Sequence, residues 1–379
     1  MPGIFSKILD SFKNVANTNI NAGNQSAIGI DIGTSSIKVV EIKKQGGKAM
    51  LETYGSIALG PYADLKLGAI TNLPLEKITE ALNEVLKQAG VNSKEVALSV
   101  PVQSSLVFSM ELPVQINEKD LTSIVSTEAR KYIPIPINEV SLDFFEIPKK
   151  ELTFEEANNP DFIKEDSIKR EVLVVAIQND ALEKIKSIAS NSSLSSSFFE
   201  VEIFSAVRSC FEHELSLVVL IDFGASRVKI SFVEFGVVKS YHTINRGSYD
   251  ITSAISKSLS IPFERAESLK KEFGMYDNEI EQKLKDVIKV HTDYIFSEIN
   301  NVLLRYEKKY SRSVTKIIFT GAGSLMKGFK EEAINNFKVE VQIATPFRKV
   351  GSPVFLEKVL DDIGPEFSVA LGLALRKLQ

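Results

Sequence analysis

The stretch Ile28-Gly29-Ile30-Asp31-Ile32-Gly33-Thr34-Ser35-Ser36-Ile37-Lys38-Val39-Val40-Glu41 decides the fold of this 379-residue chain. An apolar strand leads into an Asp-X-Gly turn that is rich in hydroxyls, and a second apolar strand follows. The tight turn of such a hairpin exposes backbone N–H and hydroxyl groups, which suit a phosphate chain. Asp31 stands where a carboxylate can hold hydrated Mg²⁺. Because Asp, Gly and Ser also favour ordinary turns, one copy of this pattern would be weak support for phosphate binding.

The same pattern returns about half a chain later, in Leu220-Ile221-Asp222-Phe223-Gly224-Ala225-Ser226-Arg227-Val228-Lys229. A third glycine loop, Phe319-Thr320-Gly321-Ala322-Gly323-Ser324, follows an apolar strand and precedes a predicted helix over 325–335. Its glycine pair would let an adenine or a ribose approach the backbone closely. The sequence therefore predicts two phosphate hairpins and one adenosine loop, in that order.

Composition fits a globular protein with two or more domains, since 44% of residues are hydrophobic and 25% are charged. The net charge of −4 and the isoelectric point of about 5.7 argue against nucleic-acid binding. Cys210 is the single cysteine, which excludes disulfides, fits a reducing cytoplasm and is expected to be a core thiol. The three histidines, His213, His242 and His291, match no metal spacing.

The N-terminal residues 4–16 have apolar side chains at helical spacing, namely Ile4, Phe5, Ile8, Leu9, Phe12, Val15 and Ala16. Residues 17–26 form a polar tether. This amphipathic helix would dock on a membrane surface or a partner, or fold back on its own domain. Neither a secretory signal nor an apolar run of about 20 residues is present, so we expect a cytoplasmic protein.

Hydrophobic patterning predicts strands, helices and an acidic linker along the chain. In the first half, strands are expected at 27–32, 37–42, 49–59, 96–100, 102–112, 141–147 and 172–177, helices at 75–89, 118–131 and 180–190, and the linker at 149–169. Helices near 247–259, 262–273 and 279–309, a strand at 339–343 and a final helix at 367–378 are expected in the second half. The elements between 102 and 196 would form a small α+β subdomain.

The three loops, in this order, resemble those of the actin-like ATPase superfamily, which has a two-lobed α/β, ribonuclease H-like fold. The inserted subdomain, with Glu128-Ala129-Arg130-Lys131-Tyr132-Ile133-Pro134-Ile135-Pro136, Glu139-Val140 and Asp143, resembles its FtsA/PilM branch. Within that branch, the first hairpin is similar to the PilM family of type IV pilus assembly. FtsA proteins end in a membrane-binding helix, whereas this chain ends in a predicted core helix, which favours PilM.

The resemblance implies a domain organisation for the whole chain. Residues 1–26 would be the helix and tether, 27–101 the core of the first lobe, 102–196 the inserted subdomain, 197–216 the connecting helix, and 217–379 the second lobe, with a mostly helical part at about 247–312. The resemblance does not explain the N-terminal 26 residues.

The resemblance also implies a MgATP site. The β-phosphate would be wrapped by Gly33, Thr34, Ser35 and Ser36 with Lys38 as charge partner, the γ-phosphate by Gly224, Ala225 and Ser226, and the adenosine by Gly321, Ala322, Gly323 and Ser324. Asp31 and Asp222 would hold Mg²⁺ through waters, and Glu267 with Lys270 or Lys271 would grip the ribose and adenine. Lys38 could instead face solvent as an ordinary strand residue, and a Glu–Lys pair one turn apart occurs on any exposed helix.

Catalysis is expected to be slow or negligible. Actin uses a glutamine in its connecting helix, whereas the matching stretch here, 202–208, has none. Glu202 is the one candidate base, and it could equally stabilise the helix N-terminus. Two alternatives are an FtsA-like cell-division protein and a sugar or acetate kinase of the same fold. A kinase needs an aspartate base between the lobes, and the sequence offers no well-placed candidate.

PilM-like proteins capture the cytoplasmic N-terminal peptide of the membrane protein PilN, in a groove beside the inserted subdomain. Residues 102–196 would therefore carry this peptide, and the segment 132–136 would be either a wall of the groove or core. We further expect contacts with other pilus inner-membrane components, self-association, and a position at the inner face of the cytoplasmic membrane. Membrane contact would be indirect or through residues 4–16.

Overall fold

The computed structural model describes residues 26–113, 115–147, 169–212, 216–276 and 282–378. Two compact units are present: residues 100–184 form one, and residues 26–99 with 185–378 form the other. The predicted N-terminal helix and tether and nearly all of the acidic linker lie outside the described residues.

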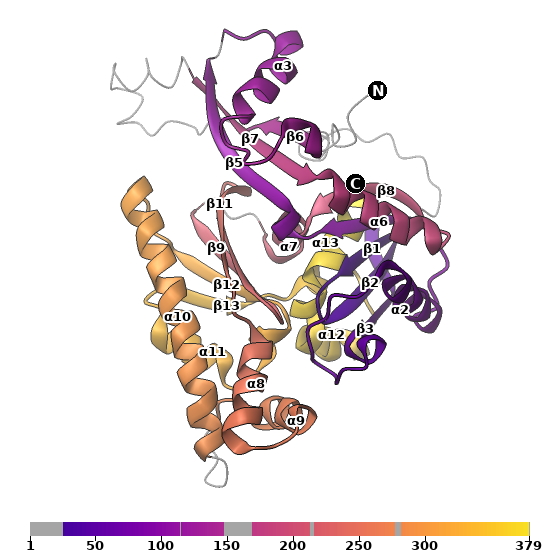
Figure 1. The fold of residues 1–379 in the computed structure, drawn as a ribbon, viewed down its shortest axis with the longest axis vertical. Helices are drawn as coiled ribbons and strands as arrows, with labels where there is room; N and C mark the ends of the chain where they lie inside the picture. The colour runs from indigo at the N-terminus through magenta and orange to yellow at the C-terminus, as the bar shows by residue number, and fades with distance from the viewer. Residues whose placement is uncertain (1–25, 114, 148–168, 213–215, 277–281, 379) are drawn as a thin grey trace. The chain divides into compact units, whose positions relative to one another are not determined.

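The larger unit contains a first five-stranded sheet with the order β3-β2-β1-β4-β8. Its strands are β1 Ser26–Ile32, β2 Ser36–Gln45, β3 Lys48–Ala58, β4 Glu95–Val100 and β8 Ser195–Val201, with helices α2 Leu75–Gln88 and α7 Glu202–Cys210. β1 pairs antiparallel with β2 and parallel with β4. The C-terminal helices α12 Glu357–Ile363 and α13 Ser368–Leu378, yellow in Figure 1, lie beside the indigo strands β1 to β3. Gly29 permits this approach, because a Cβ there would lie 1.9 Å from the Ala370 carbonyl oxygen.

A second five-stranded sheet repeats this arrangement, with the order β11-β10-β9-β12-β13. It consists of β9 Val218–Phe223, β10 Val228–Glu234, β11 Val237–Ile244, β12 Lys316–Thr320 and β13 Glu340–Ile343. Helices α8 Ser248–Leu259, α9 Phe263–Phe273, α10 Gln282–Tyr310 and α11 Phe329–Asn336 belong to this half. A fully buried phenylalanine group, Phe223, Phe296, Phe319 and Phe329, joins the sheet to α10 and α11. Two sheets of identical strand order confirm the expected two-lobed α/β class.

The smaller unit is an α+β fold built on an antiparallel sheet with the order β5-β7-β6. The strands are β5 Ser105–Pro113, β6 Val140–Glu146 and β7 Lys169–Gln178, and the helix is α3 Glu118–Ala129. Val125 and Ala129 of α3 pack in one apolar core with Val172 and Val174 of β7. Helix α6 Asn179–Asn191 runs across the boundary between the units.

Several boundaries differ from the sequence predictions. The helix expected at 325–335 starts at Phe329, because Gly328 has a left-handed backbone (φ 76°), and a short 3-10 helix, Ala322–Leu325, precedes it. Strand β8 was missed, since three serines begin it, and α12 and β11 were not predicted either. The smaller compact unit ends at Lys184, within α6, and β8 joins the first sheet.

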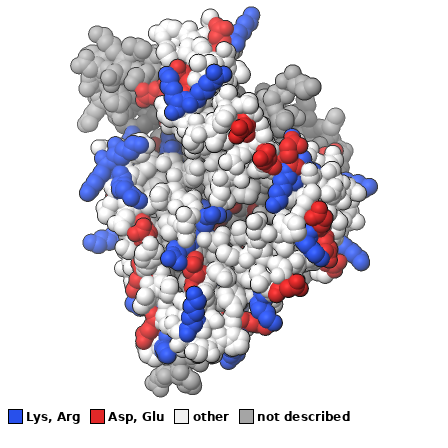
Figure 2. Space-filling model, in the orientation of Figure 1, with Lys and Arg blue, Asp and Glu red and all other residues white. Residues whose placement is uncertain are grey.

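The surface of the described residues carries charges of both signs. On the face drawn in Figure 2, Lys and Arg are interspersed with Asp and Glu, as on an ordinary solvated surface. Within the described part of the chain, no helix is both long enough and apolar enough to cross a membrane.

Candidate nucleotide site

The first hairpin closes through a hydrogen bond from the Gly33 amide to the Ser36 carbonyl at 3.0 Å. Asp31 lies opposite Lys38 in the antiparallel register of β1 and β2. The Lys38 ammonium points back to the turn, where it donates to Ser36 Oγ at 2.7 Å. On the other side, Ser99 at the end of β4 donates its hydroxyl to Asp31 Oδ1 at 2.8 Å. The turn thus presents hydroxyls, a lysine and an oriented carboxylate together.

The second hairpin repeats the turn, because the Gly224 amide donates to the Arg227 carbonyl, also at 3.0 Å. Asp222 lies opposite Lys229, as Asp31 lies opposite Lys38. The amides of Ser248 and Tyr249, at the start of α8, donate to the carbonyls of Gly224 and Ala225. These bonds fix the turn to the N-terminus of α8, an end that favours nearby negative charge.

The two turns meet directly. The Thr34 hydroxyl donates to the Ser226 hydroxyl at 3.1 Å, although 192 positions separate the residues in sequence. Both residues were predicted to contact phosphates, Thr34 from the first hairpin and Ser226 from the second. The larger unit therefore brings the two predicted phosphate loops to one place.

Lys229 was not singled out by the sequence reasoning, and it is the charged centre of the second hairpin. Its Nζ lies 2.9 Å from Asp222 Oδ2 and 2.6 Å from Glu202 Oε2 at the start of α7. The three side chains are only 14%, 16% and 11% exposed, respectively. A small cavity beside them is lined by these three side chains together with Ile203, Ala206, Leu220 and Ser231. The repeated spacing of seven residues from Asp to Lys in both hairpins was the available sequence signal.

Burial shifts the pKa values in this cluster. Burial alone would lower the pKa of Lys229, but Asp222 and Glu202 outweigh it and raise that pKa above the ordinary lysine value, so the ammonium stays charged. Burial also raises the pKa of Glu202, and the Asp31 and Asp222 carboxylates add to this rise against the pull of Lys229. Glu202 contacts Lys229 at 2.6 Å and also stands in the first turn of α7.

The third loop packs tightly on the second hairpin. Gly321 has φ 83°, and a Cβ there would lie 2.3 Å from Asp222 Oδ1. A Cβ on Gly323 would lie 2.1 Å from a ring carbon of Phe223. Ser324 is buried and donates its hydroxyl to the Gly321 carbonyl at 2.8 Å. Both glycines are therefore required by the protein's own packing, whatever the loop binds.

The predicted ribose pair on α9 is buried. Lys270 Nζ lies 2.8 Å from Glu267 Oε2 and 2.8 Å from the Thr252 hydroxyl, which itself donates to Glu267 at 2.6 Å. Lys271 is 3.4 Å from the other Glu267 oxygen. A Cβ on Gly68, in the first lobe, would lie 3.0 Å from the Glu267 carboxyl carbon, so a first-lobe loop touches this pair. Both candidate lysines thus contact Glu267.

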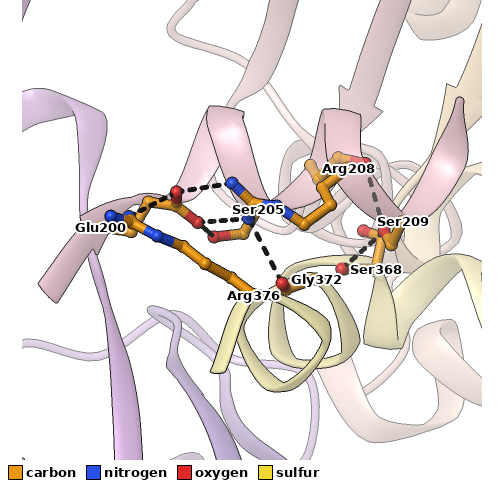
Figure 3. Close-up of polar contacts among 8 residues, drawn as sticks. Glu200, Ser205, Arg208, Ser209, Ser368, Gly372 and Arg376 are labelled. Carbon is orange, nitrogen blue, oxygen red and sulfur yellow. Dashed lines mark hydrogen bonds and ion pairs between the residues drawn. The ribbon is translucent and has the colours of Figure 1, made fainter. Parts of the chain in front are cut away.

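A second buried carboxylate lies two residues before Glu202 (Figure 3). The Glu200 carboxylate accepts hydrogen bonds from both terminal guanidinium nitrogens of Arg208, at 2.6 and 2.8 Å. It accepts a third from the Arg376 guanidinium of α13, at 2.7 Å. The Arg208 guanidinium also donates to the Gly372 carbonyl of α13 at 3.2 Å. Although burial opposes it, Arg208 and Arg376 hold the pKa of Glu200 below the ordinary value. These ion pairs join α7 to the C-terminal helix.

The two aspartates of the hairpins differ in how well they suit a metal ion. Among the described residues, no group of three or more His, Cys, Asp or Glu side chains is arranged to hold a metal directly. Asp31, oriented by Ser99, fits a hydrated Mg²⁺ held through waters. The Asp222 carboxylate is already paired with the Lys229 ammonium, so it suits a hydrated Mg²⁺ ion poorly. The Cys210 thiol, whose pKa burial raises to about 11, stays protonated at neutral pH.

Known proteins share this architecture. The complex described as the PilM-PilN type IV pilus biogenesis complex matches with a TM-score of 0.76 and 22% identity, over 94% of this chain and 100% of that chain. The ethanolamine utilization protein EutJ from Carboxydothermus hydrogenoformans matches with a TM-score of 0.53 and 14% identity, over 93% and 90% of the two chains. Both likenesses confirm the actin-like fold.

Sequence comparison adds the family. Cell division protein FtsA of Staphylococcus epidermidis is 25% identical over 373 residues, which cover 91% of this chain and 77% of FtsA. The family model described as type IV pilus assembly protein PilM matches residues 29–378, nearly the whole chain. The PilM match and the PilM-like structure fit better than the FtsA alternative. The chain belongs to the PilM family of actin-like type IV pilus assembly proteins.

Proposed function

We propose that this chain is an ATP-binding scaffold at the cytoplasmic face of the pilus inner-membrane complex, and that it captures the cytoplasmic N-terminal peptide of PilN. The observation that carries the nucleotide part is the meeting of the two hairpin turns, joined from Thr34 to Ser226. The partner part is supported by membership of the PilM family and by the PilM-PilN complex that shares this fold.

Each loop has a role in this proposal. Gly33, Thr34, Ser35, Ser36 and Lys38 receive the β-phosphate, and Gly224, Ala225 and Ser226 receive the γ-phosphate. Asp31 would bind the waters of a Mg²⁺ ion that arrives with the nucleotide, and Lys38 supplies positive charge to the phosphates. Glu267 and Lys270 contact the ribose and adenine, together with the loop Gly321, Ala322, Gly323 and Ser324.

Turnover is slow in this proposal. Glu202 is the candidate base, but its carboxylate is bound to Lys229 at 2.6 Å. Because that side chain is also only 11% exposed, an attacking water has poor access to it. The protein therefore acts mainly by binding nucleotide, and any ATPase activity is slow.

Calorimetry with ATP, after removal of co-purified nucleotide, tests the binding. Ser35→Asp and Ser226→Asp place a carboxylate in each phosphate turn and should each weaken ATP binding at least about tenfold by charge repulsion. Ser123→Asp, on α3 of the other unit, is the control and should bind ATP like the unchanged protein. An unchanged protein without ATP affinity would refute the nucleotide part.

The PilN peptide is assigned to the smaller compact unit. In the segment predicted to be wall or core, Ile133 is buried in the core, whereas Tyr132 is 52% exposed and stacks on Phe108 with ring centroids 4.8 Å apart. An exposed aromatic ring that stacks on a second aromatic ring is typical of a peptide-anchoring surface.

Tyr132→Ala should weaken binding of a synthetic PilN N-terminal peptide about tenfold, measured by fluorescence anisotropy. Tyr276→Ala removes an equally exposed tyrosine (54%) from the larger unit and is the control. Equal affinities for the two variants would place the peptide elsewhere.

A further inference from the structure

The Lys229 ammonium lies next to the Asp222 carboxylate, in the place that a metal ion bound by this carboxylate would take. The ammonium lies between two carboxylates, 2.9 Å from Asp222 and 2.6 Å from Glu202, in a largely buried setting. Its counterpart in the first hairpin, Lys38, donates to Ser36 instead, and Asp31 is held by Ser99. The lysine of the first hairpin therefore contacts a hydroxyl, whereas the lysine of the second hairpin contacts two carboxylates.

The surroundings favour an ammonium ion over a hydrated metal at this place. Mg²⁺ keeps several waters and gives them up reluctantly, so it needs room and polar walls. Apart from the three charged side chains, the small cavity beside Asp222 is lined by Ile203, Ala206 and Leu220 and by a single hydroxyl residue, Ser231. An ammonium at the end of an aliphatic stem satisfies the carboxylates without a hydration shell.

We propose that Lys229 is an internal cation that takes the place of the divalent metal at Asp222, so that nucleotide binding to this chain depends little on Mg²⁺. The inference rests on the proposed nucleotide binding, which it deepens by assigning the cation at the second hairpin. It also accounts for the two contacts of Lys229, since one ammonium pairs with both carboxylates.

A metal titration without nucleotide tests the assignment first. Mn²⁺, which accepts the same oxygen ligands as Mg²⁺, is titrated into the full-length protein and followed by electron paramagnetic resonance. Lys229→Ala opens the space between Asp222 and Glu202 and should bind one Mn²⁺ at least about tenfold more tightly than the unchanged protein. Adding Asp222→Asn to this variant should abolish the gain.

Lys330→Ala is the control, because it removes a lysine from the exposed surface of α11. It should leave Mn²⁺ affinity within about twofold of the unchanged protein, since it lies outside both hairpins. Equal Mn²⁺ affinity in the unchanged protein and in Lys229→Ala would overturn the inference.

The second readout is the ratio of ATP affinity in Mg²⁺ to that in EDTA. The unchanged protein should give a ratio below about five, and Lys229→Ala a ratio about tenfold larger. Equal ratios would contradict the inference. If ATP fails to bind at all, the proposed function fails, and the Mn²⁺ titration alone decides the role of Lys229.

Loss of one buried cation can prevent folding, so a second variant keeps the test decisive. Lys229→Ala with Glu202→Gln removes one positive and one negative charge and leaves Asp222 to bind metal. This double variant should still bind Mn²⁺ more tightly than the unchanged protein, and its failure to do so would count against the assignment.

Discussion

The hairpin of β1 and β2 and the hairpin of β9 and β10 have the same local geometry but different neighbours. Both close with a 3.0 Å bond from the glycine amide, and both place Asp opposite Lys. In the first, Ser99 orients Asp31. In the second, the corresponding β12 residue, Thr320, donates instead to the Pro365 carbonyl, and Lys229 binds Asp222. The turn is a local property, whereas the charge around it depends on distant segments.

A second contrast concerns what covers each hairpin. Gly29 on β1 and Leu220 on β9 both lie two residues before the aspartate. A Cβ at Gly29 would collide with the backbone of α13, whereas Leu220 is a buried side chain beside the charged cluster. The first hairpin is thus held by a close helix backbone and the second by side-chain packing.

Gly29→Ala is expected to have the largest effect. The new methyl would lie 1.9 Å from the Ala370 carbonyl oxygen and 2.8 Å from the Ala374 amide nitrogen, both backbone atoms that can move only with α13. We expect a loss of about 3 kcal/mol or more in the free energy of unfolding, measured by urea denaturation.

Gly46→Ala is the control, because it lies in the turn between β2 and β3 and a Cβ there meets nothing within 4 Å. Its left-handed backbone (φ 58°) should cost only about 1 kcal/mol. If both alanines cost the same, the close approach of α13 is not what sets the first hairpin apart.

The sequence was sufficient to predict the structural features that depend on residues close together in the chain. The two turns and most helices follow from spacing, glycine and apolar periodicity, whereas the two-lobed class follows from the resemblance to the actin-like superfamily. The ion pair between Lys229 and Glu202 could not be predicted, because it joins β10 to α7 across the fold. Strand β8 was not predicted for a similar reason. Its opening serines lack the apolar alternation of a strand, and it forms by pairing in a sheet built mainly from residues 26–100.

Glu202→Gln tests the electrostatics of the second hairpin through pH. Because the folded pKa of Glu202 is raised above its ordinary value of about 4.5, its carboxyl contributes stability fully below that pH. This contribution is lost as the pH rises through the folded pKa. Glutamine cannot ionise, so the variant's free energy of unfolding should rise relative to that of the unchanged protein as the pH increases from 5 to 8, measured by urea unfolding.

Glu200→Gln is the opposite case on the same strand–helix junction. Its folded pKa is lowered, so its contribution is present above about pH 4.5 and is lost as the pH falls through the folded value. This variant should lose about 3 kcal/mol at neutral pH, because two arginines are left without their carboxylate. If the free energies of unfolding of both variants changed in the same direction relative to the unchanged protein as the pH rises, the proposed difference between these carboxylates would be contradicted.

Ser99→Ala is expected to have the smallest effect, and it separates orientation of an aspartate from general stability. The Ser99 hydroxyl donates to Asp31 at 2.8 Å and accepts the Ile32 amide at 3.3 Å, so its removal should cost about 1 kcal/mol. Because Asp31 then loses its fixed orientation, ATP affinity in Mg²⁺ should fall about threefold by calorimetry. Thr320→Val removes the corresponding hydroxyl of the second sheet, which binds Pro365 rather than an aspartate. It should lower stability by a similar amount and leave ATP affinity unchanged. A fall in affinity for both variants, or for neither, would mean that Ser99 stabilises the sheet without positioning Asp31.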